Sequence, residues 1–103
     1  MPVYKIQKRS GSIVDFNLEK IEDAINQAAK ATGKHDEIVA QVLAQDVYAR
    51  LEEEFLDKIP TVEEVQDIVE DMLIQYGYAE TAKAYILYRE KRREAREEKN
   101  VVV

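Results

Sequence analysis

The sequence contains no cysteine and a single histidine, and these two shortages exclude several kinds of site. Without cysteine there is no disulfide scaffold and no thiolate metal site, and the composition fits a reducing compartment. His35 lies in a polar segment, where we expect a solvated side chain rather than a catalytic base. The only serines, Ser10 and Ser12, have no general base near them, and no spacing of histidines and carboxylates resembles a metal site. We therefore expect neither a metal centre nor an autonomous enzyme.

Long apolar runs and glycine-rich loops are also missing. No apolar run approaches the roughly 20 residues that a membrane-spanning helix needs, and the first residues lack the basic-then-apolar order of a signal peptide. We therefore expect a cytoplasmic protein that does not enter a membrane. A lone Gly11 makes neither a Walker loop nor a dinucleotide-binding fingerprint. Any nucleotide site in this chain must rely on side-chain cations instead.

The charges of the chain are unevenly distributed. The net charge is −6, yet residues 1–9 carry three cations and no acid, and residues 83–99 carry seven cations against four acids. The stretch 10–82 carries five cations against seventeen acids. An acidic body argues against general nucleic-acid binding, which usually needs a broad basic face. If the two basic ends meet in the fold, they form a local positive pocket that suits a small anion such as a nucleotide.

The first third of the chain is expected to form a β-hairpin and one helix. Residues 3–8 mix β-branched, aromatic and long polar side chains as strands do, and residues 13–16 are expected to return as a second strand after the turn at 10–12. Asn17 is a good N-cap for a helix whose apolar residues recur at helical spacing. Gly33 is expected to end that helix.

Three further helices complete the expected fold. Asp36 is a candidate N-cap for the second helix, whose apolar stripe comprises Ile38, Val39, Val42, Leu43, Val47, Leu51 and Phe55. Residues 61–64, Thr-Val-Glu-Glu, form a capping box that begins the third helix. The fourth begins near Tyr78 or Ala79 and becomes wholly charged from Arg89. Ile59 is a candidate for a brief extra strand. The expected fold is α+β but mostly α: a four-helix bundle capped by a small β-hairpin or a three-stranded mixed sheet.

The segment from Lys8 to Lys20 is the strongest candidate for a binding site. Lys8 and Arg9 precede the turn, and Lys20 lies in the first turn of the expected helix, where backbone N–H groups are free. Each of these cations alone is more typical of a solvated surface. Together, three cations and a helix N-terminus within one short segment predict a cradle for a phosphate chain.

This segment resembles the start of an ATP-cone domain, and the resemblance extends over nearly the whole chain in the right order. It covers residues 3–25, the capping box, and the Tyr-Ile-Leu-Tyr-Arg stretch at residues 85–89. ATP-cones are small regulatory domains at the N-terminus of ribonucleotide reductases, and they also occur in a bacterial repressor of reductase genes. The resemblance implies an overall-activity switch, in which ATP permits turnover and dATP stops it, often through a change of oligomeric assembly. It divides the chain into a cone at 1–98 and the start of a linker or following domain at 99–103.

The resemblance also implies seven nucleotide-binding residues. Two form the triphosphate-binding basic pair, three form the strand-to-helix corner around phosphate, sugar and base, one caps the third helix, and one lies on the last helix. In chain order they are Lys8, Arg9, Asn17, Lys20, Ile21, Thr61 and Lys91. The ligand implied is ATP or dATP with Mg²⁺, and the implied partners are the catalytic domain or subunit of a ribonucleotide reductase and further copies of the cone.

Two other interpretations compete with a reductase switch. One is the cone of a transcriptional regulator, which would need a zinc ribbon or another DNA-reading element that this cysteine-free chain does not provide. The other is a helical protein-interaction module without a nucleotide, whose basic ends bind an acidic partner. Stabilisation by nucleotides would separate the reductase switch from this last module.

Overall fold

The computed structural model describes residues 3–100, with side chains described for residues 3–95. Within this range it forms a two-stranded antiparallel hairpin and four helices, which confirms the predicted fold class. The elements are β1 (Lys5–Gln7), β2 (Ile13–Asp15), α1 (Leu18–Ala31), α2 (Glu37–Glu54), α3 (Val62–Gln75) and α4 (Ala79–Asn100). The end of the chain predicted to begin a linker or a further domain lies partly outside the described residues, at 101–103.

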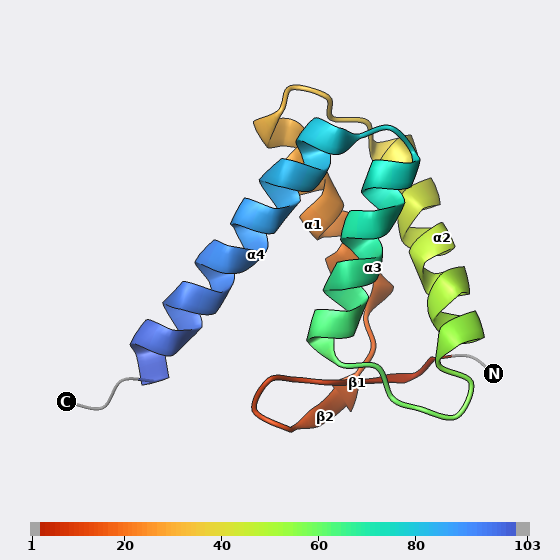
Figure 1. Cartoon of the computed structure of the whole chain (residues 1–103), viewed down its shortest axis with the longest axis vertical. Helices are drawn as coiled ribbons and strands as arrows, with labels where there is room; N and C mark the ends of the chain where they lie inside the picture. The colour runs from red at the N-terminus through yellow and green to blue at the C-terminus, as the bar shows by residue number, and fades with distance from the viewer. Residues whose placement is uncertain (1–2, 101–103) are drawn as a thin grey trace.

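The hairpin lies across one end of the helices (Figure 1). Ile6 pairs with Val14 at its centre, and Gly11 turns the chain with a φ of 93°, a conformation that favours glycine. A third segment touches the sheet at one point only, because Gln7 N–H donates to the Pro60 carbonyl over 2.9 Å and Gln7 forms an isolated parallel bridge with Thr61. The hairpin is therefore the sheet of this fold, and the alternative with a third strand reduces to one bridge.

The predicted helix starts are confirmed by their hydrogen bonds. The Asn17 side chain accepts from the Glu19 N–H over 3.0 Å, and the Asp36 side chain accepts from Ile38 at the same distance. In α3, Thr61 and Glu64 each accept from the other's backbone N–H over 3.1 Å, which completes the capping box. These caps fix where α1 and α3 begin, and both beginnings face the hairpin (Figure 1).

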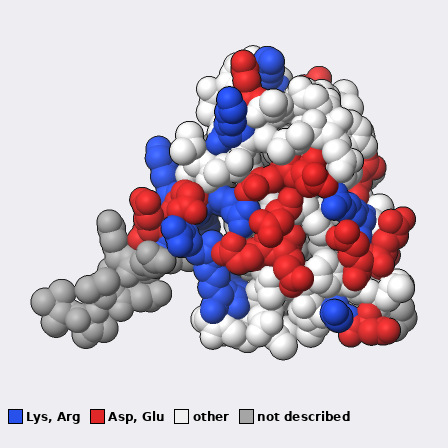
Figure 2. Space-filling model, in the orientation of Figure 1, with Lys and Arg blue, Asp and Glu red and all other residues white. Residues whose placement is uncertain are grey.

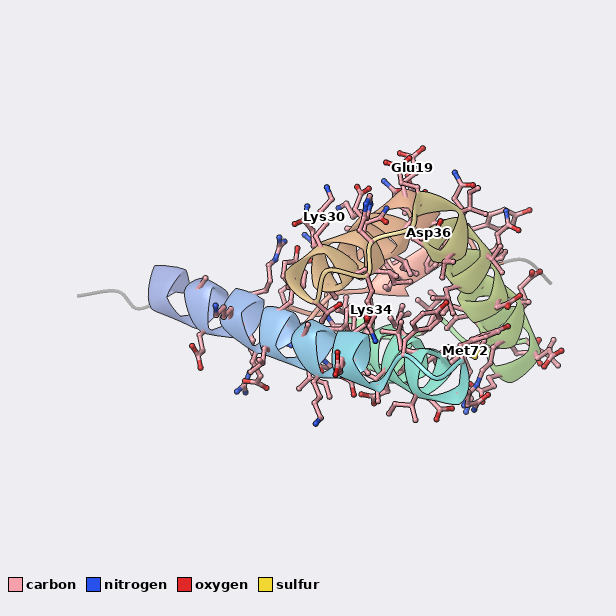
Figure 3. The ribbon with its side chains drawn as sticks, turned by 90° about the horizontal axis from the view of Figure 1, so that it is seen from above. Glu19, Lys30, Lys34, Asp36 and Met72 are labelled. Atoms are coloured by element: carbon pink, nitrogen blue, oxygen red, sulfur yellow. The ribbon has the colours of Figure 1, made fainter. Side chains whose placement is uncertain are left out.

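Seen from above, the four helices surround one core (Figure 3), with successive helices in contact and α4 closing against α1. The most deeply buried aliphatic residues are Ile25, Val47, Leu51, Val69 and Leu73. The predicted stripe of α2 is wrong at two positions, since Ile38 is 72% and Val42 is 50% exposed. Ala40 and Ala44 are buried instead, because they share one face of α2 with the buried residues Leu43, Val47 and Leu51.

Helix α4 is the longest element and differs in character along its length. Its first part contributes Ala82 and Tyr85 to the core, while the part from Arg89 onward is charged and extends beyond the other helices (Figure 1). Among the described helices none is both long and apolar enough to cross a membrane. The charged part of α4 lies on the side of the molecule where the hairpin turn projects.

Candidate functional site

A cavity of about 380 Å³ opens between the hairpin, the first turns of α1 and α3, and α4. This volume lies within the usual range for small-molecule sites. Its walls carry six cations against two acids; the cations are Lys8, Arg9, Lys20, Arg89, Arg92 and Arg93, and the acids are Asp15 and Asp23. Figure 2 shows basic side chains gathered along α4 and toward the hairpin, beside a broad acidic surface over α3. The basic ends of this acidic chain do meet, and they meet around the cavity.

Five of the seven predicted site residues line this cavity. They are Lys8, Arg9, Asn17, Lys20 and Ile21. The turn of the hairpin and the N-cap of α1 bring them together, because the chain passes from β2 into α1 within two residues. Lys8 and Lys20 are exposed and make no ion pair among the side chains that the structure describes, so their charges are available to an anion.

The other two predicted residues, Thr61 and Lys91, are not part of the lining. The Thr61 hydroxyl accepts from the Glu64 N–H in the capping box of α3, and Lys91 is exposed on α4 outside the cavity wall. Residues on α4 that do reach the cavity follow helical spacing from a buried tyrosine: Tyr85, Tyr88, Arg89, Arg92 and Arg93. Lys91 does not lie on this face of α4. The same spacing, counted from Tyr85 in the sequence, would have identified Arg92 and Arg93.

Arg89 is the most enclosed cation of the site, with 12% of its side chain exposed. It contacts three carboxylates of α3: Glu63 at 2.6 Å, Asp67 at 3.1 Å and Glu70. Burial alone would lower the pKa of Arg89, but the hydrogen bonds to Glu70, Asp67 and Glu63 outweigh it and raise the pKa above its ordinary value. Arg89 is therefore a permanent cation that joins α4 to α3.

Aromatic and amide side chains complete the walls of the cavity. The Arg92 guanidinium lies over the Tyr88 ring, with its central carbon 5.8 Å from the ring centre. Arg92 also donates a hydrogen bond to the Tyr88 hydroxyl over 3.3 Å. Gln66 of α3 carries a buried side-chain oxygen that has no hydrogen-bond partner within the described part of the chain. A buried acceptor without a donor favours a ligand that supplies one. Sequence reasoning missed Gln66, since a polar residue in mid-helix has no local signal.

Tyr85 separates the core from the cavity, and it should make stability depend on alkaline pH. Burial raises the pKa of its phenol, so the unfolded chain ionises at this position before the folded chain does. The contribution is fully present below the unfolded pKa of about 10 and is lost above it, at about 1.4 kcal/mol per pH unit. We expect Tyr85→Phe to reduce the loss of stability between pH 9 and 11, measured by urea unfolding. Tyr4→Phe, at a tyrosine 71% exposed, is the control and should keep the wild-type profile.

Metal ligands are not grouped at this site. Among the described residues, no three histidine, aspartate or glutamate side chains lie close enough to hold an ion. Of the two carboxylates on the cavity wall, Asp15 is paired with Lys5, and this lysine lowers the pKa of Asp15 by hydrogen bonding and by its charge. The arrangement can therefore bind an anion through cations, an N-terminal helix turn and aromatic walls.

Comparison with known proteins agrees with this chemistry. The family model described as the ATP cone domain matches residues 4–94. A vitamin B12-dependent ribonucleoside-diphosphate reductase of Thermoplasma acidophilum is 40% identical over 97% of this chain and 13% of its own length. An anaerobic ribonucleoside-triphosphate reductase of Haemophilus influenzae is 35% identical over 97% of this chain and 14% of its own length. A ribonucleoside-diphosphate reductase subunit alpha of Chlamydia trachomatis is 36% identical over 89% of this chain and 10% of its own length. The chain thus spans about one-tenth to one-seventh of these relatives.

Proposed function

The chain belongs to the ATP-cone family, a family of nucleotide-binding regulatory domains, and we propose that its cavity binds ATP or dATP to control the overall activity of a ribonucleotide reductase. The observation that carries this proposal is the convergence of six cations from the hairpin, α1 and α4 on one cavity, in a chain whose net charge is −6. The relatives named above are reductases, and the regulated partner proposed here is a reductase catalytic domain or subunit.

The proposed ligand contacts follow from the position of each group. Lys8, Arg9 and Lys20 bind the phosphates at the positive end of the α1 helix dipole. Asn17 and Ile21 lie at the same corner and contact the sugar and base. Mg²⁺ would enter with the triphosphate and be held chiefly by phosphate oxygens and water, since Asp15 and Asp23 are the only carboxylates among the described lining residues and Asp15 is paired with Lys5. Thr61 and Lys91, which lie outside the lining, remain predictions.

Regulation would proceed by population shift. ATP and dATP can favour different arrangements of the cone only if each binds those arrangements with different affinity. We propose that these arrangements differ in how cones associate with one another or with the partner enzyme. Sedimentation velocity of the whole reductase, with ATP and with dATP, tests this step: an identical assembly state with both nucleotides would contradict it.

Removing either free cation should weaken nucleotide binding. We expect Lys8→Ala and Lys20→Ala each to lower the affinity for dATP by ~1–3 kcal/mol, because each deletes a charge-assisted hydrogen bond. Isothermal titration calorimetry measures the loss. Lys30→Ala is the matched control, since Lys30 is an exposed lysine in the last turn of α1, outside the cavity lining (Figure 3), and its loss should not change the affinity. Unchanged affinity in both test variants would show that the site is misplaced.

A nucleotide-free interaction module makes the opposite prediction. Thermal unfolding with ATP, dATP and GTP should show stabilisation by at least one of them, because a ligand that binds only the folded chain raises its stability. If no nucleotide raises the midpoint even at millimolar concentration, the chain binds through its surface alone and the proposed function is wrong.

A further inference from the structure

The Glu63 carboxylate forms ion pairs with two of the cations that line the cavity. Glu63 lies in the first turn of α3, and its two carboxylate oxygens contact different arginines. One oxygen contacts Arg9, at the hairpin turn, and the other lies 2.6 Å from Arg89, on α4. Both arginines line the cavity. One carboxylate thus ties the hairpin turn, α3 and α4 together.

The two arginines depend on Glu63 to very different degrees. Arg89 has two further carboxylate partners, Asp67 and Glu70, and is only 12% exposed. The Arg9 side chain is 28% exposed, and Glu63 is its one ion-pair partner among the side chains described. Without its contact to Glu63, Arg89 would still be held by Asp67 and Glu70, whereas Arg9 would have no ion-pair partner among the described side chains. The ion pair between Arg9 and Glu63 is therefore the contact of this network that is lost most easily.

A triphosphate can replace Glu63 as the partner of Arg9. Partly exposed ion pairs such as this one contribute little, whereas an arginine can bind phosphate oxygens through two parallel hydrogen bonds. The Glu63 side chain is 47% exposed and lies at a helix N-terminus, so its charge stays favourably placed when Arg9 leaves. Glu63 keeps its contact with Arg89 after the exchange.

We infer that Glu63 is an internal counterion that competes with the ligand's phosphates for Arg9 and thereby sets the affinity of the site. This inference rests on the proposed function, namely that the cavity binds a nucleoside triphosphate. Binding exchanges the Arg9–Glu63 pair for an Arg9–phosphate pair and releases the hairpin turn from α3. Glu63 is a positioning residue: it acts on the ligand through Arg9 and not by contact.

Neutralising this carboxylate should strengthen binding. We expect Glu63→Gln to bind dATP about three- to tenfold more tightly than the wild type, because the carboxylate that competes with phosphate for Arg9 is removed. Inorganic tripolyphosphate, which has no base or sugar, should show the same gain. Asp67→Asn is the matched control: it removes another carboxylate from Arg89 but none from Arg9, and it should leave the affinity within twofold.

A cycle with Arg9 separates competition from a general change of charge. In an Arg9→Ala background, Glu63→Gln should give no gain, because the arginine under competition is gone. A gain that persists without Arg9, or equal or weaker binding by Glu63→Gln, overturns the inference while the proposed function stands. If the wild type binds neither dATP nor tripolyphosphate, the proposed function itself fails. Urea unfolding of each variant confirms that the folded chain is being titrated.

Discussion

Truncating Leu51 to alanine should lower the free energy of unfolding by about 2–5 kcal/mol, the range typical of a fully buried leucine. Leu51 has no exposed surface and lies near the end of α2 that faces the hairpin (Figure 1). The cost combines the lost burial of the side chain with the cavity that its neighbours cannot fill. Chemical unfolding in urea, followed by circular dichroism, measures it.

Leu56 offers a matched comparison for this prediction. It lies five residues further along the chain, has the same side chain, and is 57% exposed. Leu56→Ala should change the free energy of unfolding by no more than about 0.5 kcal/mol, as surface substitutions usually do. Equal effects of the two variants would mean that α2 does not bury the face described above.

The features that sequence reasoning located correctly depend on neighbours within a few residues. Asn17, Asp36 and the Thr61–Glu64 capping box each form hydrogen bonds that span two or three positions, so the residue types alone indicate them. The predicted basic segment also stays together, since one turn and one cap connect Lys8 to the start of α1. Five of the seven predicted site residues share the cavity for this local reason.

The features that sequence reasoning missed depend on which face of a helix meets another element. Ala40 and Ala44 are buried in α2 while Ile38 is exposed, and hydrophobicity alone ranks them the other way. Glu63 was recognised only as part of a cap, yet it contacts arginines 54 positions before it and 26 after it in the chain. Such pairings arise from the packing of α3 against α4 and the hairpin, which no local pattern records.

Replacing Arg89 by methionine should cost about 2–3 kcal/mol of stability, although methionine fills the space of the arginine stem. Glu63, Asp67 and Glu70 lie on one stripe of α3 and would lose their shared counterion. Removing one partner of a fully buried pair costs about 3–5 kcal/mol. The value here is smaller because Glu63 and Asp67 are 47% and 70% exposed and water screens them.

A substitution of Glu70 tests whether this loss of stability arises from the carboxylates left without a counterion. Glu70 is the most enclosed of the three, with 21% of its side chain exposed, so it bears most of the cost of an unpaired charge. Glu70→Gln combined with Arg89→Met should therefore be more stable than the sum of the single losses predicts, with a coupling of about 1–2 kcal/mol in urea unfolding. Additive losses would mean that Arg89 stabilises α4 by packing alone. With coupling, Arg89 holds α4 beside the cavity, while Lys8 and Lys20, which have no ion-pair partner among the described side chains, attract the anion.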